Sequence, residues 1–152
     1  MPRRPPVGLV GLLLIAGCTG GGSTPKDSVD VAPVNGLQPQ VLLSCTDLKG
    51  QLPAQLADGV KKRPAVPESS TTVAYGADPA IQVRCGVPEG LAADEPYTFD
   101  EVHWAMHDTG ATRTWTTRGL KVNVQVVIPD QFSAQAELLG AMAAPIRSAL
   151  TR

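Results

Sequence analysis

The clearest pattern in the chain is a strict alternation of side chains close to the C-terminus. Residues 120–128 are apolar at every second position, and the positions between them are mostly polar. The apolar positions are Leu120, Val122, Val124, Val126 and Ile128, and the intervening ones are Lys121, Asn123, Gln125 and Val127. Because successive side chains of a strand point to opposite faces, the alternation predicts a strand in a sheet with one covered and one partly solvated face.

Shorter segments predict the other strands of an antiparallel sheet. They are rich in β-branched or aromatic residues and are separated by turn signals. Together with the segment above they make about five strands: Thr71–Ala74, Ile81–Cys85, Val102–His107, Thr112–Thr117 and Leu120–Ile128. We expect Tyr75–Pro79 to form the corner between the first two strands and Gly86–Pro96 to form a loop before the last three.

Apolar residues at three- and four-residue intervals predict a helix that starts near Gln40 and weakens at Gly50 and Pro53. Its apolar stripe consists of Val41, Leu42, Cys45, Leu48 and Leu52. A second short turn is expected over residues 54–60. The basic run Lys61–Arg63 then favours a solvated bend, and contact with anionic lipid headgroups is the alternative.

The same spacing predicts a C-terminal helix, which Asp130 or Ser133 can cap and which Pro145 should kink. Its apolar stripe consists of Phe132, Ala136, Leu139, Ala143, Ile146 and Leu150. Both helices have one face to bury, and the sheet has one face to cover. The expected fold class is therefore α+β, a two-layer sandwich in which an antiparallel sheet of about five strands is covered on one face by an N-terminal and a C-terminal helix.

The first 18 residues look like the export signal of a bacterial lipoprotein. Arg3 and Arg4 precede the apolar segment Val7–Ala16, and Leu14–Cys18 is a lipobox-like sequence. The apolar segment has about ten residues, whereas a membrane-spanning helix needs roughly 20. We expect residues 1–17 to be a cleaved signal peptide and Cys18 to carry lipid, which anchors the protein at the outer face of the cytoplasmic membrane. The alternatives are an uncleaved anchor and an ordinary signal with a chance cysteine.

Residues 18–39 are expected to be the lipidated cysteine and a flexible tether, because this segment is rich in Gly, Ser, Thr, Pro and Asp. Residues 40–152 then form a single globular domain. Removal of residues 1–17 takes away two arginines and no acidic residue, which leaves 11 basic and 14 acidic side chains and a net charge of −3. That balance argues against nucleic acid as a partner.

The two remaining cysteines, Cys45 and Cys85, are expected to form a disulfide, because an exported protein enters a compartment that permits one. The bond would close a loop of 40 residues and would stabilise the fold by roughly 4 kcal/mol at most on the chain-entropy model. Two functional thiols are the alternative. The sequence has no Cys-x-x-Cys motif and no histidine near either cysteine, which argues against that alternative.

Several short sequences in the expected element order resemble one known family. They are the helix that contains Cys45, the corner Tyr75–Ile81, the run Arg84–Pro88, Trp104 and the strand end Val126–Pro129. Together they resemble the actinobacterial lipoprotein family catalogued as domain of unknown function 3515, over about residues 41–150. Members usually have Trp where this chain has Tyr75. The resemblance implies a secreted, commonly lipid-anchored envelope protein of Gram-positive actinobacteria, and it supplies no activity or catalytic residues.

His103 and His107 are the first candidates for a metal site, since they lie four residues apart with Asp108 beside them. On a strand, four residues span about 13 Å, which is too far for two ligands of one ion. Solvated histidines on a sheet are therefore expected, with no metal and no cofactor. No Gly-x-Ser-x-Gly sequence marks a nucleophile either. The acidic residues before the last three strands predict a solvated loop, and paired acid–base carboxylates are the alternative: Glu89, Asp94, Glu95, Asp100 and Glu101.

The aromatic residues complete the list of candidates. Trp104 is expected in the core, whereas Tyr75 and Trp115 could line one groove and form a contact surface. The leading hypothesis is a non-enzymatic binding or scaffold module of the envelope, held to the membrane through lipid on Cys18, with an envelope protein or cell-wall component as its partner. The alternative is a small envelope hydrolase or carrier that acts on wall precursors through the acidic loop and His103 or His107.

Overall fold

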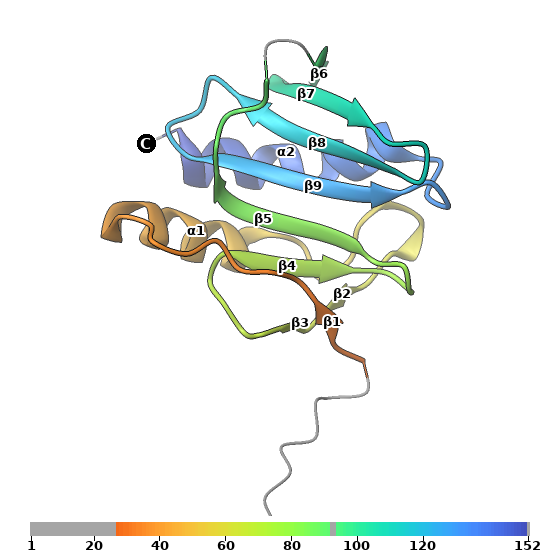
Figure 1. Ribbon diagram of the computed structural model, residues 1–152, viewed down its shortest axis with the longest axis horizontal. Coiled ribbons are helices and arrows are strands. Elements are labelled where there is room, and N and C mark those ends of the chain that lie inside the picture. Colours follow the sequence, from red (N-terminus) through yellow and green to blue (C-terminus); the bar gives the residue numbers. More distant parts are fainter. Residues whose placement is uncertain (1–26, 92–93, 152) are drawn as a thin grey trace, which may run out of the picture.

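The computed structural model describes residues 27–91 and 94–151 (Figure 1). The expected signal peptide, the lipidation site Cys18 and the first part of the tether lie outside the described residues. No helix in the described part of the chain is long and apolar enough to span a membrane.

The main sheet is antiparallel and has seven strands in the order β2-β4-β5-β9-β8-β7-β6. Its strands are β2 (Lys62–Arg63), β4 (Thr72–Tyr75), β5 (Ile81–Val87), β6 (Glu95–Phe99), β7 (Val102–Asp108), β8 (Thr112–Arg118) and β9 (Asn123–Pro129). A separate parallel pair joins β1 (Val29–Asp30) to β3 (Ala65–Val66). The expected number of about five strands is therefore wrong for the main sheet.

The two strands that the sequence did not predict are the edge strands, β2 and β6. Strand β2 has only two residues and lies inside the basic run that was expected to be a solvated bend. Strand β6 begins with Glu95 and Pro96, which disfavour a strand, and Pro96 is tolerated because β6 is an edge strand. Its only apolar signal is the pair Tyr97 and Phe99, which pack against the core.

Both main helices lie on one face of the sheet and contact each other (Figure 1). Helix α1 (Pro39–Gln51) starts with a proline in its first turn, where a missing N–H is tolerated. The short helix η1 (Ala57–Gly59) follows it. Helix α2 (Gln135–Leu150) begins later than expected because Phe132 first closes a turn onto the carbonyl of Pro129. Pro145 lies inside α2, and the helix continues past it to the end of the element.

The core lies between these helices and the sheet, and the alternation in residues 120–128 is confirmed. Val124, Val126 and Ile128 are fully buried, whereas Gln125 and Val127 on the other face are only half-buried. Trp104 is also fully buried, as expected. The sheet therefore has a covered face, against the helices, and an opposite face, which we call the open face.

The disulfide between Cys45 and Cys85 is present, with the two Cα atoms 5.6 Å apart. Cys45 lies on the buried side of α1, and Cys85 lies on the covered face of β5. The bond joins the N-terminal helix to a strand 40 residues further along the chain. It therefore fixes one layer of the sandwich to the other.

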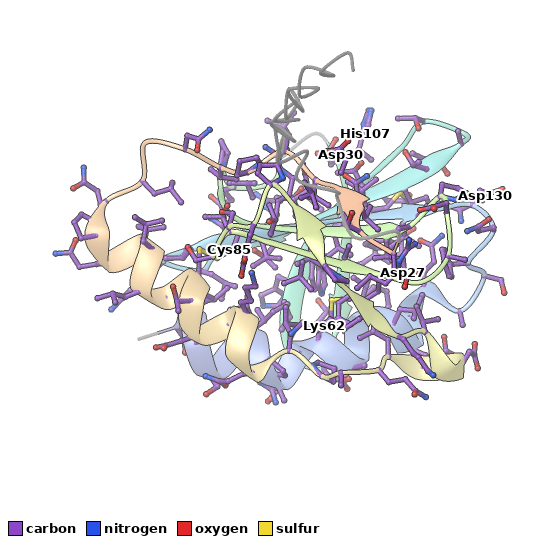
Figure 2. The ribbon with its side chains drawn as sticks, turned by 90° about the horizontal axis from the view of Figure 1, so that it is seen from below. Asp27, Asp30, Lys62, Cys85, His107 and Asp130 are labelled. Carbon is purple, nitrogen blue, oxygen red and sulfur yellow. A yellow bond between two sulfur atoms is a disulfide. The ribbon has the colours of Figure 1, made fainter. Side chains whose placement is uncertain are left out.

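The segment before α1 packs on the open face, which differs from the flexible tether expected up to residue 39. Val29 and Val31 are buried in a small cluster with Ala74 and Ala80. The main-chain N–H of Val31 also donates to the carbonyl of Val66. Figure 2 shows this segment and the helices on opposite sides of the sheet. Two alternating valines are too few to reveal a strand in sequence, and β1 is ordered by contacts with residues far along the chain.

Candidate functional site

The two aromatic residues expected to form a contact surface are buried, so that prediction is wrong. Tyr75 has no exposed surface, and its hydroxyl donates to the carbonyl of Pro53 at 2.9 Å. Burial raises the pKa of Tyr75. Trp115 is 5% exposed, and Tyr97 and Phe99 pack edge-on against its ring. Both residues point to the covered face, because Tyr75 pairs with Ile81 and Trp115 pairs with Val126, two buried positions.

The polar groups gather instead on the open face. Residues 27–37 cover one part of this face, and residues 88–91 cover another. Gly90 comes so close to the sheet that a Cβ added to it would lie 2.6 Å from the Cβ of Ala105. A hollow remains between the two covering segments.

This hollow, which we call the open-face cavity, has a volume of about 400 Å³. Its floor consists of side chains from β5, β8 and β9, namely Arg84, Thr114, Thr116 and Gln125. Val34 lines one side and residues 87–91 line the other, with Asp94 and His107 beside them. Figure 2 shows His107 on the side of the sheet away from the helices.

Among the described residues, Arg84 is the only cation in the floor of the open-face cavity, and its hydrogen-bond partners are neutral. Its Nε donates to the carbonyl of Ala32 at 3.1 Å, and Nη1 donates to Oε1 of Gln125 at 3.3 Å. Arg84 forms none of the ion pairs found in residues 27–91 and 94–151. A guanidinium group has five N–H donors, so three remain for a ligand.

His107 meets one carboxylate of the acidic loop. Its Nδ1 lies 3.5 Å from Oδ1 of Asp94, and its side chain is 64% exposed. Asp108 follows the alternation of the covered face and accepts hydrogen bonds from the N–H of Gly110 and from Nε of Arg113. Those two contacts hold the pKa of Asp108 below its usual value. His107, Asp108 and a loop carboxylate therefore do not converge on one site, an arrangement that would have favoured the hydrolase hypothesis.

His103 belongs to a different hollow. Its Nδ1 lies 3.0 Å from the hydroxyl of Thr98, and it shares a hollow of about 470 Å³ with Glu89 and Arg118. Within the described ranges, no three side chains of His, Cys, Asp or Glu are grouped closely enough to hold a metal ion.

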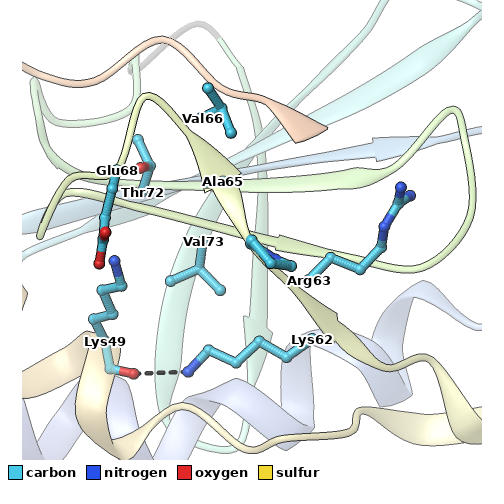
Figure 3. A pocket seen from close by; sticks show the side chains of 9 residues that line it. Lys49, Lys62, Arg63, Ala65, Val66, Glu68, Thr72 and Val73 are labelled. Atoms are coloured by element: carbon cyan, nitrogen blue, oxygen red, sulfur yellow. Dashed lines mark hydrogen bonds between the residues drawn. The ribbon is translucent and has the colours of Figure 1, made fainter. Parts of the chain in front are cut away.

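A third hollow, which we call the edge cavity, has a volume of about 540 Å³ and lies beside β2 and the first half of β4 (Figure 3). Lys49 of α1 and Lys62 of β2 line it together with residues 63–66, Glu68, Thr72 and Val73. Lys62 is half-buried, and its ammonium donates to the carbonyls of Lys49 and Leu52. The solvated bend expected at residues 61–63 is therefore wrong for Lys62. The sequence analysis predicted neither the open-face cavity nor the edge cavity. Lys49 and Lys62 lie 13 residues apart in the sequence, and no pattern indicates that they share a cavity.

The run Arg84–Pro88 combines three structural roles within a few residues. Arg84 forms part of the floor of the open-face cavity, and Cys85 forms the disulfide. Gly86 has a φ of +86° at a register shift between Cys85 and Val87, and Leu37 packs where a Cβ would stand. A side chain at this position would be strained by the backbone and would displace Leu37.

Comparison with known proteins identifies the family of the chain. The search of curated proteins and the search of solved structures both gave no match. The family model described as "Protein of unknown function (DUF3515)" matches residues 5–152. The match includes both helices, all the strands and both cavities. The chain therefore belongs to the DUF3515 family.

Proposed function

We propose that this protein is a lipid-anchored binding module on the outer face of the cytoplasmic membrane. The open-face cavity is its recognition site, and the ligand is a cell-wall component that carries a carboxylate. Lipid on Cys18 supplies the anchor.

The proposed location is supported by two features of the chain. Residues 1–18 have the charge, the apolar segment and the terminal cysteine of a lipoprotein signal. The Cys45–Cys85 disulfide is consistent with export, because disulfides persist mainly in oxidising compartments.

The observation that carries the binding proposal is the guanidinium of Arg84, which lines the cavity and forms no ion pair with any carboxylate of the described residues, although Glu89 and Asp94 also line the cavity. Guanidinium groups bind carboxylates through two parallel hydrogen bonds. A volume of about 400 Å³ falls within the usual range for small-ligand sites. Thr114, Thr116 and Gln125 add hydrogen-bonding groups around Arg84. A peptide or sugar fragment of the wall matches this site better than the flat surface of a folded protein.

The alternative function, a small hydrolase or carrier for wall precursors, has less support. The ion pair of His107 within the described residues is with Asp94 at 3.5 Å, a distance longer than that of a hydrogen bond suited to proton transfer. Asp108 is engaged by Gly110 and Arg113. The described groups around the open-face cavity therefore favour binding over acid–base catalysis.

The test is a titration of the full-length protein, in nonionic detergent, with soluble wall peptides and with the same peptides amidated at their carboxylates. We expect saturable binding of the free acids and at least tenfold weaker binding of the amides. Arg84→Gln should weaken binding of the acids to the same degree. Arg118→Gln is the matched control, because Arg118 lies on the open face but lines the hollow of His103. Equal binding of acids and amides would contradict the proposal.

A further inference from the structure

The edge cavity arises where β2 separates from β4. Lys62 pairs with Tyr75 and Arg63 pairs with Ala74, and the pairing ends there. The chain then turns away, and β3 pairs with β1 instead. Within the described residues, no strand therefore pairs with the first half of β4, Thr72 and Val73, on this side. The end of α1 closes the resulting hollow (Figure 3).

Two ammonium groups lie at this cavity, and their partners in the structure are neutral. Lys49 donates to the carbonyl of Ser69 at 2.7 Å. Lys62 donates to the carbonyls of Lys49 and Leu52 at 2.8 and 3.2 Å. Glu68 also lines the cavity, but none of the ion pairs of the described chain involves either lysine. Burial and the nearby charge of Lys49 both lower the pKa of Lys62. An anion in the cavity would favour the charged form of Lys62 and would therefore raise this pKa.

Thr72 also lines the edge cavity, but its side chain lies on the open face of β4, because Thr72 pairs with Arg84. Its Oγ1 has almost no exposed surface, so it does not reach an anion held by the two lysines. The remaining lining is largely apolar, with Pro64, Ala65, Val66 and Val73.

We propose that the edge cavity is a second ligand site, which binds a small amphiphilic anion. The anionic head, a carboxylate or a phosphate, lies between the ammonium groups of Lys49 and Lys62 and accepts hydrogen bonds from them. The apolar body of the ligand packs against Pro64, Val66 and Val73. This site is separate from the open-face cavity and does not depend on the ligand proposed there.

The experiment uses the full-length, ¹⁵N-labelled protein in nonionic detergent. The probes are octanoate, octyl phosphate and inorganic phosphate, and the amide signals of Thr72 and Val73 are followed by NMR. We expect saturable shifts with octanoate or octyl phosphate and weaker binding of inorganic phosphate, which lacks the apolar body. Vesicles of anionic and of zwitterionic phospholipid form a second arm. Shifts with anionic vesicles alone would identify a lipid headgroup as the source of the anion.

Two variants decide whether the proposed groups bind the anion. Lys49→Gln should weaken binding at least tenfold, because it removes a charged donor. Lys61→Gln is the matched control, since Lys61 carries the same charge beside Lys62 but does not line the edge cavity. The absence of saturable shifts with all probes and vesicles, or an equal loss in Lys61→Gln, would overturn the proposal.

Discussion

The indole Nε1 of Trp115 donates a 2.8 Å hydrogen bond to Oε1 of Gln135, and both side chains are buried. This contact joins the middle of β8 to the first residue of α2. It satisfies the indole N–H, whereas Nε2 of Gln135 has no partner in the described part of the chain. The start of the C-terminal helix is therefore fixed to the sheet by one polar contact inside an apolar layer.

Replacement of Gln135 by Leu should lower the free energy of unfolding by about 1–3 kcal/mol, because the indole N–H of Trp115 then has no acceptor. The double variant Trp115→Phe/Gln135→Leu removes both partners. It should therefore be more stable than the sum of the two single changes predicts. Urea unfolding of the four proteins checks this coupling, and strictly additive losses would contradict it.

Loss of the disulfide should destabilise the protein strongly. In Cys45→Ala/Cys85→Ala we expect the free energy of unfolding to fall by about 2–5 kcal/mol, because the closed 40-residue loop is released in the unfolded state. Alkylation of the wild-type protein without reductant should leave both cysteines unmodified. Ready labelling of both thiols would show that the bond does not form in the cell.

The proposed lipid anchor can be tested at a single position. Cys18→Ala should abolish incorporation of labelled fatty acid and should release the protein from the membrane fraction. Cys45→Ala/Cys85→Ala is the control, because it keeps Cys18 and should retain the label. Continued membrane association of Cys18→Ala would show that the apolar segment of residues 7–16 is itself the anchor.

Asp108 should contribute to stability in a pH-dependent manner. The N–H of Gly110 and then Arg113 lower the pKa of Asp108 in the folded state below its ordinary value of 3.8. Its contribution is therefore present above about pH 4 and is lost as the pH falls through the lowered value. The difference in melting temperature between the wild type and Asp108→Asn should shrink below pH 4. Asp130→Asn, which alters a more exposed partner of Arg113, serves as the comparison.

Sequence patterns predicted the parts of the fold in which one residue type repeats with a fixed period. Val124, Val126 and Ile128 alternate with less apolar positions along β9, so their burial on one face followed directly. Strand β8 carries Thr on both faces, so its pattern did not show that Trp115 points to the core. The register with Val126 shows it, but register depends on the neighbouring strands.

The cavities could not be predicted for a related reason. The open-face cavity exists because residues 27–37 and 88–91 cover two parts of the sheet and leave Arg84 between them. The edge cavity exists because β2 separates from β4 after Arg63. Both depend on where non-repeating segments end, and no periodicity carries that information. In the sequence, Lys62 belongs to a basic run and Arg84 to the run Arg84–Pro88, but neither pattern indicates a cavity.

The parallel pair of β1 and β3 sets the point at which the chain enters the folded domain. Only residues 19–28 separate Cys18 from Val29, and a fully stretched chain of that length spans roughly 40 Å. A domain held at Cys18 therefore stays within one protein diameter of the lipid surface. With that anchor, the proposed ligands would have to reach the domain in this thin layer, and the domain would not extend to the far side of a thick wall.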